Sequence, residues 1–218
     1  MVNYDENIWF THSSAAARQA VDVLQGRKVI PHDLRKAALE THLTFPTDMA
    51  SACADGNDVA VVEVSTLRRH HVQGVELNAH KVYGIAAESG VAGRSVVQGN
   101  VELLPDGHIL RDMQVAVTSY DDLKADLVSI ASRLDCPVLA VDHLYSELPD
   151  GSPVPERLAL TQALSGVASE TSVDFLSTKA KILEIGLTEA LTDQNHYRPG
   201  VEADVGRSLL DRIRSLVN

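Results

Sequence analysis

The segment that decides the fold is "DVAVVEV", Asp58 to Val64, which carries the strongest buried-strand pattern in the chain. Its near-continuous valine content is typical of a parallel strand that is covered on both faces of a sheet. Glu63 interrupts the apolar run. A carboxylate in such a strand needs a partner such as Arg68 or a nearby histidine, unless the strand position lies at the sheet edge.

Strands and helices alternate outward from this segment. Toward the N-terminus we expect a strand over 7–10, a helix over "AAARQAVDVLQG" that Gly26 ends, a strand "RKVI" and a helical stretch over 32–41. Toward the C-terminus we expect a helix over 120–134 that Ser119 caps, a strand "PVLAVD", a helix "ERLALTQALSGVASE", a strand "VDFL" and a last helix over 201–216. The alternation predicts an α/β fold, a three-layer α/β/α sandwich with a central, mostly parallel sheet.

The chain length of 218 residues is compatible with one domain that spans residues 1–218. Residues from about 67 to 120 lack a clear period and contain "RRHHVQGVELNAHKVYG", glycines at 90, 93, 99 and 107, and the turn sequence "LLPDGHIL". This stretch predicts an irregular insertion, within which a hairpin or small helices would fit.

Composition excludes several classes of function. The net charge of -11 argues against nucleic acid or an anionic membrane as a partner. We expect a cytoplasmic protein, because neither a leader nor a membrane-spanning run is visible. Cys53 and Cys136 are far apart without CxxC spacing, and the nine histidines form no HExxH motif, so we expect no metal and no cofactor. A homo- or hetero-oligomer is compatible with the sequence.

Polar residues follow each predicted strand, where open parallel sheets bind ligands. The first such turn, "THSS", holds Ser13 at a strand-to-helix junction, where its hydroxyl would be exposed beside the positive end of a helix. Ser13 is therefore a candidate nucleophile, although a serine here can also act simply as a helix cap. The neighbouring His12 is either a ligand-binding side chain or a turn residue.

Two further clusters carry candidate chemistry. In "DQNH", Asp193 could accept a hydrogen bond from one ring nitrogen of His196 while the other nitrogen takes a proton, unless the segment is a solvated loop. In "RRHH", Arg68 and Arg69 could bind a carboxylate, sulfate or phosphate, but a solvated loop is favoured, since surface Arg and His need no ligand. His143 begins the polar segment after "VLAVD".

The C-terminal segment "LTDQNHYRPGVEADVGRSLLDRI" resembles the closing segment of the SGNH or GDSL-like hydrolase family. Asp193 and His196 stand in the D-x-x-H positions, and the preceding "VPERLALTQALSGVASETSVDFLSTKAKI" resembles the penultimate helix and strand of that family. The resemblance implies a flavodoxin-like fold. It also implies a hydrolase or acyl transferase that acts on an acylated small molecule or carbohydrate, with Ser13 as nucleophile, His196 as general base and Asp193 orienting it.

Elsewhere the sequence departs from the family pattern. Thr11, His12 and Ser13 replace Gly-Asp-Ser, and Ser65 and Leu67 occupy the glycine and asparagine places of the G-x-N-D block. Loss of one oxyanion donor typically lowers the rate by about 10²- to 10³-fold. Two alternatives therefore stay open: a non-hydrolytic binding or partner subunit of a biosynthetic complex, and an enzyme that uses the same pocket for different acid-base chemistry. The expected substrate contacts are His12, Ser65, Arg68, Arg69, Asn78 and His143.

Overall fold

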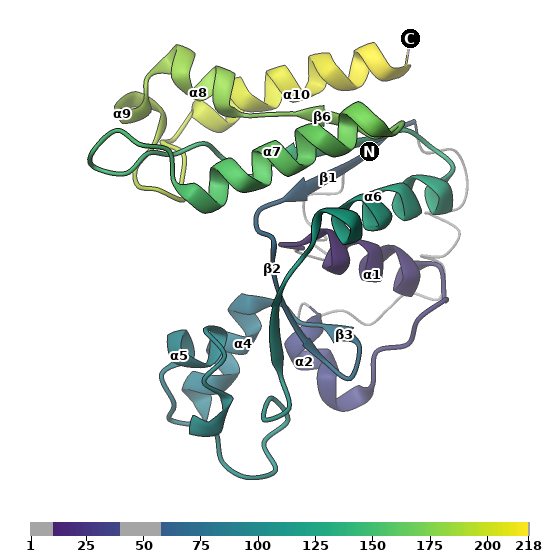
Figure 1. Ribbon diagram of the computed structural model, residues 1–218, viewed down its shortest axis with the longest axis vertical. Coiled ribbons are helices and arrows are strands. Elements are labelled where there is room, and N and C mark those ends of the chain that lie inside the picture. Colours follow the sequence, from purple (N-terminus) through teal and green to yellow (C-terminus); the bar gives the residue numbers. More distant parts are fainter. Residues whose placement is uncertain (1–10, 40–57, 218) are drawn as a thin grey trace. The chain divides into compact units, whose positions relative to one another are not determined.

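The computed structural model describes residues 11–39 and 58–217. The chain divides into two compact units: unit 1 comprises 1–55 and 68–119, and unit 2 comprises 56–67 and 120–218 (Figure 1). The expected strand over 7–10 and Cys53 lie outside the described residues. That the chain forms one domain stays a prediction.

Unit 2 is built on a parallel sheet of three described strands in the order β1-β5-β6, namely β1 (Ala60–Val64), β5 (Val138–Asp142) and β6 (Asp174–Leu176). All five residues of β5 are buried. In β1 burial alternates, because Val62 and Val64 are buried whereas Val61 and Glu63 are exposed. The expectation that β1 is covered on both faces is therefore wrong, and the fully covered strand is β5.

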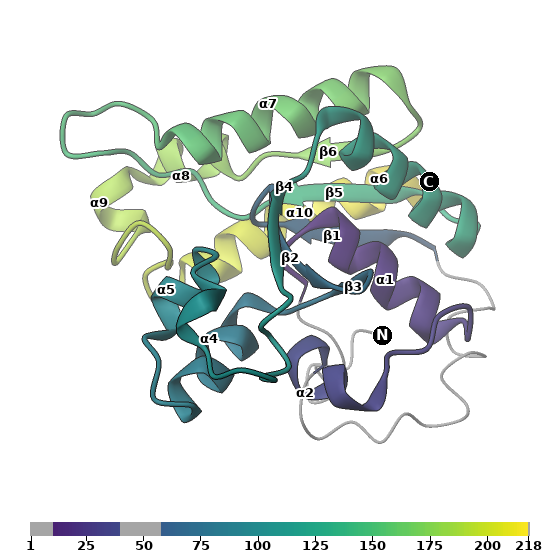
Figure 2. The ribbon, with the colours of Figure 1, turned by 60° about the horizontal axis from the view of Figure 1, so that its bottom comes forward.

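The helices of unit 2 are α6 (Tyr120–Leu134), α7 (Pro155–Glu170), α8 (Lys179–Ile185), α9 (Leu187–Ala190) and α10 (Val201–Val217). Helices α6 and α7 pack against each other and against β5, and bury leucines such as Leu127 and Leu164. Figures 1 and 2 show β6 running between α7 and α10, and Arg212 of α10 bonds Asp174 of β6 at 2.5 Å. The predicted α/β class, with a parallel sheet surrounded by helices, is confirmed.

Unit 1 contains an antiparallel sheet in the order β3-β2-β4, formed by β2 (Arg68–Val72), β3 (Val75–Glu76) and β4 (Gln114–Val117). Gln73 and Gly74 join β2 to β3 with φ values of 50° and 77°, as a two-residue hairpin turn requires. The other elements are α1 (Ser14–Leu24), η1 (His32–Leu34), α2 (Arg35–Ala38), α4 (Ala79–Glu88), α5 (Gly93–Val97) and η2 (Val101–Leu103).

The core of unit 1 gathers apolar residues from both of its chain segments, among them Leu34, Val72, Val82 and Leu110. Polar bonds also join the two segments. The Gln19 side chain of α1 donates to the Glu76 carbonyl at 2.8 Å and accepts from the Glu76 N–H at 2.9 Å. The stretch over 67–120 is thus more regular than the sequence indicates, with a sheet, two helices and a core.

Two local expectations are wrong. No strand forms at "RKVI", since residues 28–30 have no regular structure; Ile30 enters the core while Val29 is 77% exposed, and Lys28 donates to the Gly74 carbonyl at 2.6 Å. The "RRHH" segment is not a loop but most of β2. Of the helix expected over 32–41, the described part ends at Ala38.

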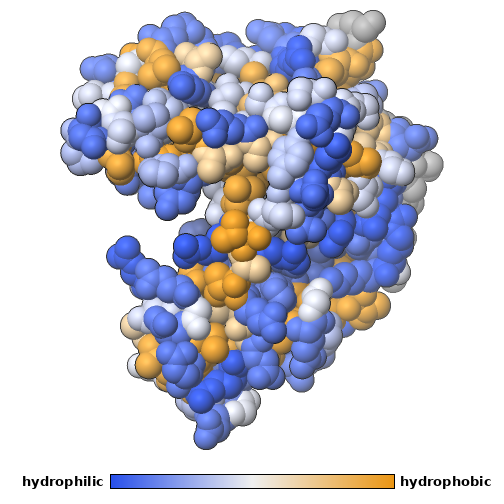
Figure 3. All heavy atoms as spheres, in the orientation of Figure 1, coloured by the Kyte–Doolittle hydropathy of each residue, from blue (hydrophilic) through white to orange (hydrophobic). Residues whose placement is uncertain are grey.

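The described surface in Figure 3 is mostly hydrophilic, with apolar patches between the polar side chains. The large hydrophobic side chains that are exposed come from different elements, for example Tyr83 of α4, Val117 of β4 and Leu210 of α10. Within residues 11–39 and 58–217, no helix is both long and apolar enough to cross a membrane.

Candidate functional site

The clearest chemical arrangement in unit 2 is the pair of Asp193 and His196. Nδ1 of His196 donates to the Asp193 carboxylate at 2.8 Å to one oxygen and 3.0 Å to the other. The His196 side chain is 73% exposed. Because the hydrogen on Nδ1 is committed to Asp193, the neutral ring keeps a lone pair on Nε2 that can take a proton.

The Asp193 carboxylate is held as an anion by its neighbours. The hydrogen bond from His196 and then the N–H of Asn195, which donates at 2.6 Å, keep the pKa of Asp193 below its usual value. A charged carboxylate is the form that fixes the ring tautomer. The expected relay between Asp193 and His196 is therefore present as a geometric pair, while its role in catalysis stays a prediction.

Arg157 of α7 and His143, the residue after β5, hold the loop that carries this pair. Arg157 of α7 donates to the Asn195 side-chain oxygen at 2.9 Å and to the Ser65 carbonyl at 3.3 Å. His143 approaches the Asn195 carbonyl through Nε2 at 3.3 Å, and the Tyr197 hydroxyl donates to the His143 carbonyl at 3.1 Å. Asn195, two positions after Asp193 and directly before His196, is thus held on two sides. We call Arg157, His143, Tyr197 and Asn195 the clamp.

Burial changes the proton affinities of two members of this clamp. Burial lowers the pKa of the Arg157 guanidinium, against the nearby carboxylates of Asp142 and Glu63. Burial also raises the pKa of Tyr197 to about 12, so its hydroxyl keeps its proton and remains a donor to the His143 carbonyl at neutral pH. The clamp is therefore a partly desolvated polar network.

A second carboxylate–histidine pair lies beside the clamp. Nδ1 of His143 donates to the Glu63 carboxylate of β1 at 2.6 Å. Nε2 of the same ring faces the Asn195 carbonyl, so both ring nitrogens lie within reach of an oxygen acceptor. Glu63 lies at the edge of the described sheet and is also part of the candidate site, so both readings of this residue hold.

Asp142, the last residue of β5, ties the strand ends together. It is 3% exposed and accepts from the hydroxyls of Thr161, Ser177 and Thr178 at 2.8, 2.7 and 3.0 Å and from the Thr178 N–H at 2.8 Å. A buried carboxylate with four donors is a satisfied structural group. These bonds hold Ser177 and Thr178, the residues just before α8, against the end of β5, where the 143–146 segment begins.

The predicted nucleophile lies in unit 1. Ser13 is the N-cap of α1; its Oγ accepts from the Ala16 N–H at 3.3 Å, and the residue is 4% exposed. The rings of His12 and His80 lie 4.9 Å apart. Asn78 caps α4, where its side-chain oxygen accepts from the His80 N–H at 2.9 Å. The structure thus brings the "THSS" turn to the first turn of α4.

The two arginines expected to bind anions lie on β2. Arg69 forms an ion pair with Glu76, which is 5% exposed. A buried carboxylate needs such a partner, so the guanidinium of Arg69 is committed to the fold of unit 1. Arg68 is exposed and pairs in register with Val117 of β4.

The predicted residues thus fall into two groups. Ser65, His143, Asp193 and His196 belong to unit 2, whereas His12, Ser13, Arg68, Arg69 and Asn78 belong to unit 1. Sequence reasoning missed Arg157, Asp142 and Tyr197 as members of the unit 2 network. Only the position of Asp142 at the end of a strand offered a signal.

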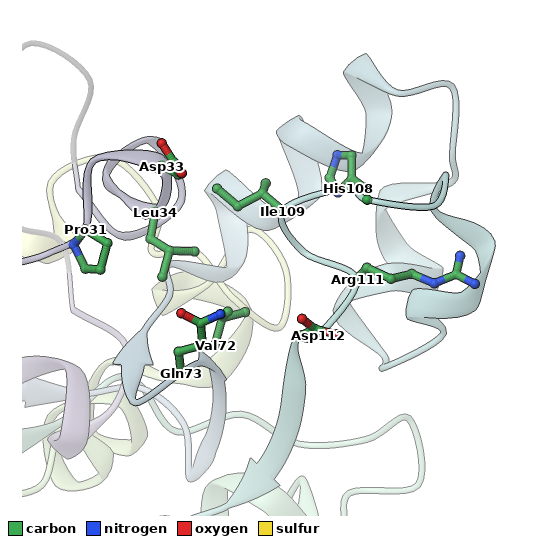
Figure 4. Close-up of a pocket in the computed structure, with 10 residues that line it drawn as sticks. Pro31, Asp33, Leu34, Val72, Gln73, His108, Ile109, Arg111 and Asp112 are labelled. Atoms are coloured by element: carbon green, nitrogen blue, oxygen red, sulfur yellow. The ribbon is translucent and has the colours of Figure 1, made fainter.

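Unit 1 also contains a cavity of about 380 Å³ between η1, the β2 end and the 107–112 loop. Two of its polar side chains are engaged elsewhere: Arg111 bonds the carbonyls of Glu102 and Leu104, and His108 bonds Ser89 at 3.0 Å. Figure 4 shows the Arg111 guanidinium directed away from the cavity. Among the described residues, no group of three His, Cys, Asp or Glu side chains could hold a metal ion.

Comparison with known proteins identifies the family. No curated protein and no solved structure matches the chain. The sequence profile of the TviD N-terminal domain family matches residues 1–96 and 97–212. Since the matched segments cover nearly the whole chain, the chain belongs to the TviD N-terminal domain family.

Proposed function

We propose that this domain is an SGNH-like acyl-transfer enzyme of polysaccharide biosynthesis, with Ser13 as nucleophile, His196 as general base and Asp193 as the residue that orients it. The observation that carries the proposal is the hydrogen-bonded pair of Asp193 and His196 with an exposed ring. The family is one of Vi antigen biosynthesis proteins, which supports a biosynthetic role.

The proposed chemistry proceeds in two balanced steps. Nε2 of His196 takes the proton of the Ser13 hydroxyl while Oγ bonds to the acyl carbon of the substrate. The C–O bond to the leaving alcohol breaks, and that alcohol takes the proton from His196. In the second step His196 takes the proton of a sugar hydroxyl, or of water, whose oxygen bonds to the acyl carbon. The bond between that carbon and Ser13 Oγ then breaks, and His196 returns the proton to Oγ.

The position of Ser13 supports a nucleophile's role through the helix that follows it. As the N-cap of α1, Ser13 lies where the unpaired N–H groups of a first helical turn stabilise negative charge. The Asn78 side chain, near the His12 and His80 rings, is our candidate for the oxyanion donor that Leu67 cannot supply.

Active-site labelling tests the proposal. A fluorophosphonate probe should form one adduct on Ser13 of the intact chain, and the adduct should disappear in Ser13→Ala and fall strongly in His196→Ala. The Ser14→Ala variant, which removes the adjacent serine of α1, is the matched control and should keep the label. Unchanged transfer of an acetyl group from an ester donor by Ser13→Ala would exclude Ser13 as nucleophile.

A second candidate function is a binding or partner subunit that does not hydrolyse esters. Burial of Ser13, and the use of its hydroxyl as a helix cap, favour this reading. It predicts no adduct and no turnover in a correctly folded chain. A third candidate uses acid-base chemistry without the serine, and the pair of Glu63 and His143 favours it; there, His196→Ala or His143→Ala would abolish activity and Ser13→Ala would not.

A further inference from the structure

The relay pair of Asp193 and His196 lies on a closed turn that also contains Asn195. The Thr192 N–H and hydroxyl donate to the His196 carbonyl at 3.0 and 3.1 Å, which closes the turn. The side chains of Asn195 and His196 are both exposed. Because these two residues are adjacent in the chain, one bound substrate can contact both side chains.

Each polar group of Asn195 except one faces a partner in unit 2. Its N–H donates to Asp193 at 2.6 Å, its carbonyl faces Nε2 of His143 at 3.3 Å, and its side-chain oxygen accepts from Arg157 at 2.9 Å. A guanidinium carries donors only, so the oxygen of the amide faces Arg157 and the NH2 group faces elsewhere. Within residues 11–39 and 58–217, Nδ2 of Asn195 has no hydrogen-bond partner. The fold thus fixes this amide and leaves its donor side open.

Arg157 also ties the amide to the end of β1. The same guanidinium donates to the Ser65 carbonyl at 3.3 Å, and Ser65 directly follows β1. Open parallel sheets bind their ligands beyond the carboxyl ends of the strands. The amide of Asn195 therefore lies at the edge of the sheet where a ligand is expected, and next in the chain to the proposed base.

An amide differs from a carboxylate of the same shape in what it can offer a substrate. An aspartate in place of Asn195 would bond Arg157 more strongly, because charge-assisted hydrogen bonds are about twice as strong as neutral ones. It would offer no donor, however, and it would repel a developing oxyanion. Asn195 forgoes the ion pair and presents an N–H donor without adding negative charge beside His196.

We propose that Nδ2–H of Asn195 donates to the acyl oxygen of the substrate, as an oxyanion donor in addition to Asn78. When Oγ of Ser13 bonds to the acyl carbon, the π electrons of the carbonyl move to its oxygen, and this oxygen accepts the hydrogen bond. When the bond to the leaving alcohol breaks, the carbonyl forms again. The role rests on the proposed function, because only an acyl substrate develops this charge.

The isosteric variant Asn195→Asp tests the donor in the full chain. It keeps the oxygen that accepts from Arg157 and removes the N–H. With 4-nitrophenyl acetate as the ester, kcat/KM should fall about 10²- to 10³-fold, which is the usual effect of losing one oxyanion donor. Amide exchange over 193–197 should stay unchanged or become slower, because the bond to Arg157 remains.

Replacement of the acyl oxygen by sulfur gives a readout that a purely structural role would not move. Sulfur accepts hydrogen bonds weakly, so loss of the donor should slow O-(4-nitrophenyl) thioacetate much less than the oxygen ester. The ratio of the oxygen-ester rate to the thionoester rate should therefore fall at least about 10-fold in Asn195→Asp. Equal slowing of both substrates would overturn the donor role.

Gln194→Glu is the matched control for charge. It makes the same change from amide to carboxylate one position earlier, at an exposed residue whose amide donates to the Glu147 carbonyl at 3.5 Å. Its rates with both substrates should equal those of the wild type. A loss as large as that in Asn195→Asp would show that added negative charge near His196 is responsible, and would overturn the donor role.

Failure of this donor and failure of the proposed function give different results. Fluorophosphonate labelling of Ser13 that is slower in Asn195→Asp, but not in Gln194→Glu, would support both. A wild-type chain that is labelled on Ser13, with an Asn195→Asp variant that keeps the wild-type rates, would retain the triad and overturn the donor. A wild-type chain that neither takes the label nor cleaves the ester would remove the triad, and the donor to an acyl oxygen with it.

Discussion

Asn195 is the residue on which the geometry of the proposed base depends. Its N–H donates to Asp193, its carbonyl faces His143 and its side chain accepts from Arg157. One residue thus connects the relay pair to the ends of β1 and β5 and to α7. The exposed ring of His196 gains its fixed position from neighbours rather than from burial.

Asp193→Asn should lower acyl transfer by roughly 10²- to 10⁴-fold, because the amide can leave the His196 ring in the wrong tautomer. Since the pKa of Asp193 is lowered in the folded chain, its stabilising contribution is present above the ordinary Asp pKa and is lost as pH falls through the lowered value. Glu170→Gln is the control: the pKa of Glu170 is also lowered, by Lys124 and Tyr120, so this variant too should lose a stabilising carboxylate at neutral pH but should keep full activity.

Arg157→Lys should loosen the loop without unfolding unit 2. A lysine cannot bond the Ser65 carbonyl and the Asn195 side chain with the fork that a guanidinium provides. We expect a loss of about 1–3 kcal/mol of local stability, measured as faster amide exchange over 193–197. Unchanged exchange there, or faster exchange spread evenly over β5 and α6, would contradict a positioning role for Arg157.

At the scale of elements, α4 and α5 approach so closely that one position must lack a side chain. A Cβ at Gly93 of α5 would lie 2.5 Å from the Tyr83 carbonyl of α4. The backbone of α4 cannot move away without disturbing Val82, which is fully buried. The contact between these helices is therefore set by a glycine rather than by an interlocking pair of side chains.

Gly93→Ala should destabilise the chain by about 1–3 kcal/mol, since overpacking forces backbone shifts. Gly84→Ala is the matched control within α4. Nothing lies within 4 Å of a Cβ there, so the same change should stabilise the helix by up to about 1 kcal/mol. Thermal unfolding should show a lower melting temperature for Gly93→Ala and an equal or higher one for Gly84→Ala. Equal changes in the two variants would show that packing at Gly93 does not decide the contact between the helices.

The sequence predicted elements well where the signals are local. Helices α7 and α10 begin and end within one residue of the expected bounds, and the start and end of α1 follow from Ser13 and Gly26. The strand at "RKVI" failed because β propensity has no effect without a pairing partner. Helices α8 and α9 were missed because both are short.

The candidate site was predictable only in part for the same physical reason. Asp193 and His196 are three residues apart, so their pairing is visible in the sequence. Arg157 reaches a carbonyl 92 residues away, and nothing in the pattern of α7 distinguishes it from a solvated arginine. The burial of Ser146, whose hydroxyl has no hydrogen-bond partner among the described residues, depends on the path of a loop that the sequence shows only as polar.

At the scale of the molecule, each unit has its own apolar core. The core around Val82 consists of unit 1 residues, while Leu127 and Leu164 are buried in unit 2. The two cores are made of different residues. We therefore expect a mutation in the core of one unit to raise amide hydrogen exchange mainly in that unit.

Val82→Ala should cost about 1–3 kcal/mol and raise amide exchange mainly in α4, α5 and β2. Leu164→Ala should do the same for β5, α6 and α7, at about 2–5 kcal/mol. Hydrogen exchange read by mass spectrometry separates these segments. Loss of protection throughout the described chain in either variant would instead support one cooperative domain over residues 1–218.

The pairing of Arg68 with Val117 on β2 and β4 has a consequence for how this chain can be rearranged. Such partners in an antiparallel ladder lie about 4.5–5.5 Å apart, so the chain enters β2 and leaves β4 at neighbouring points. A tight reverse turn can span that gap. Exchange of residues 69–116, in nature or by grafting, must nevertheless carry the 11–39 segment with it, because the core of unit 1 takes apolar residues from both segments.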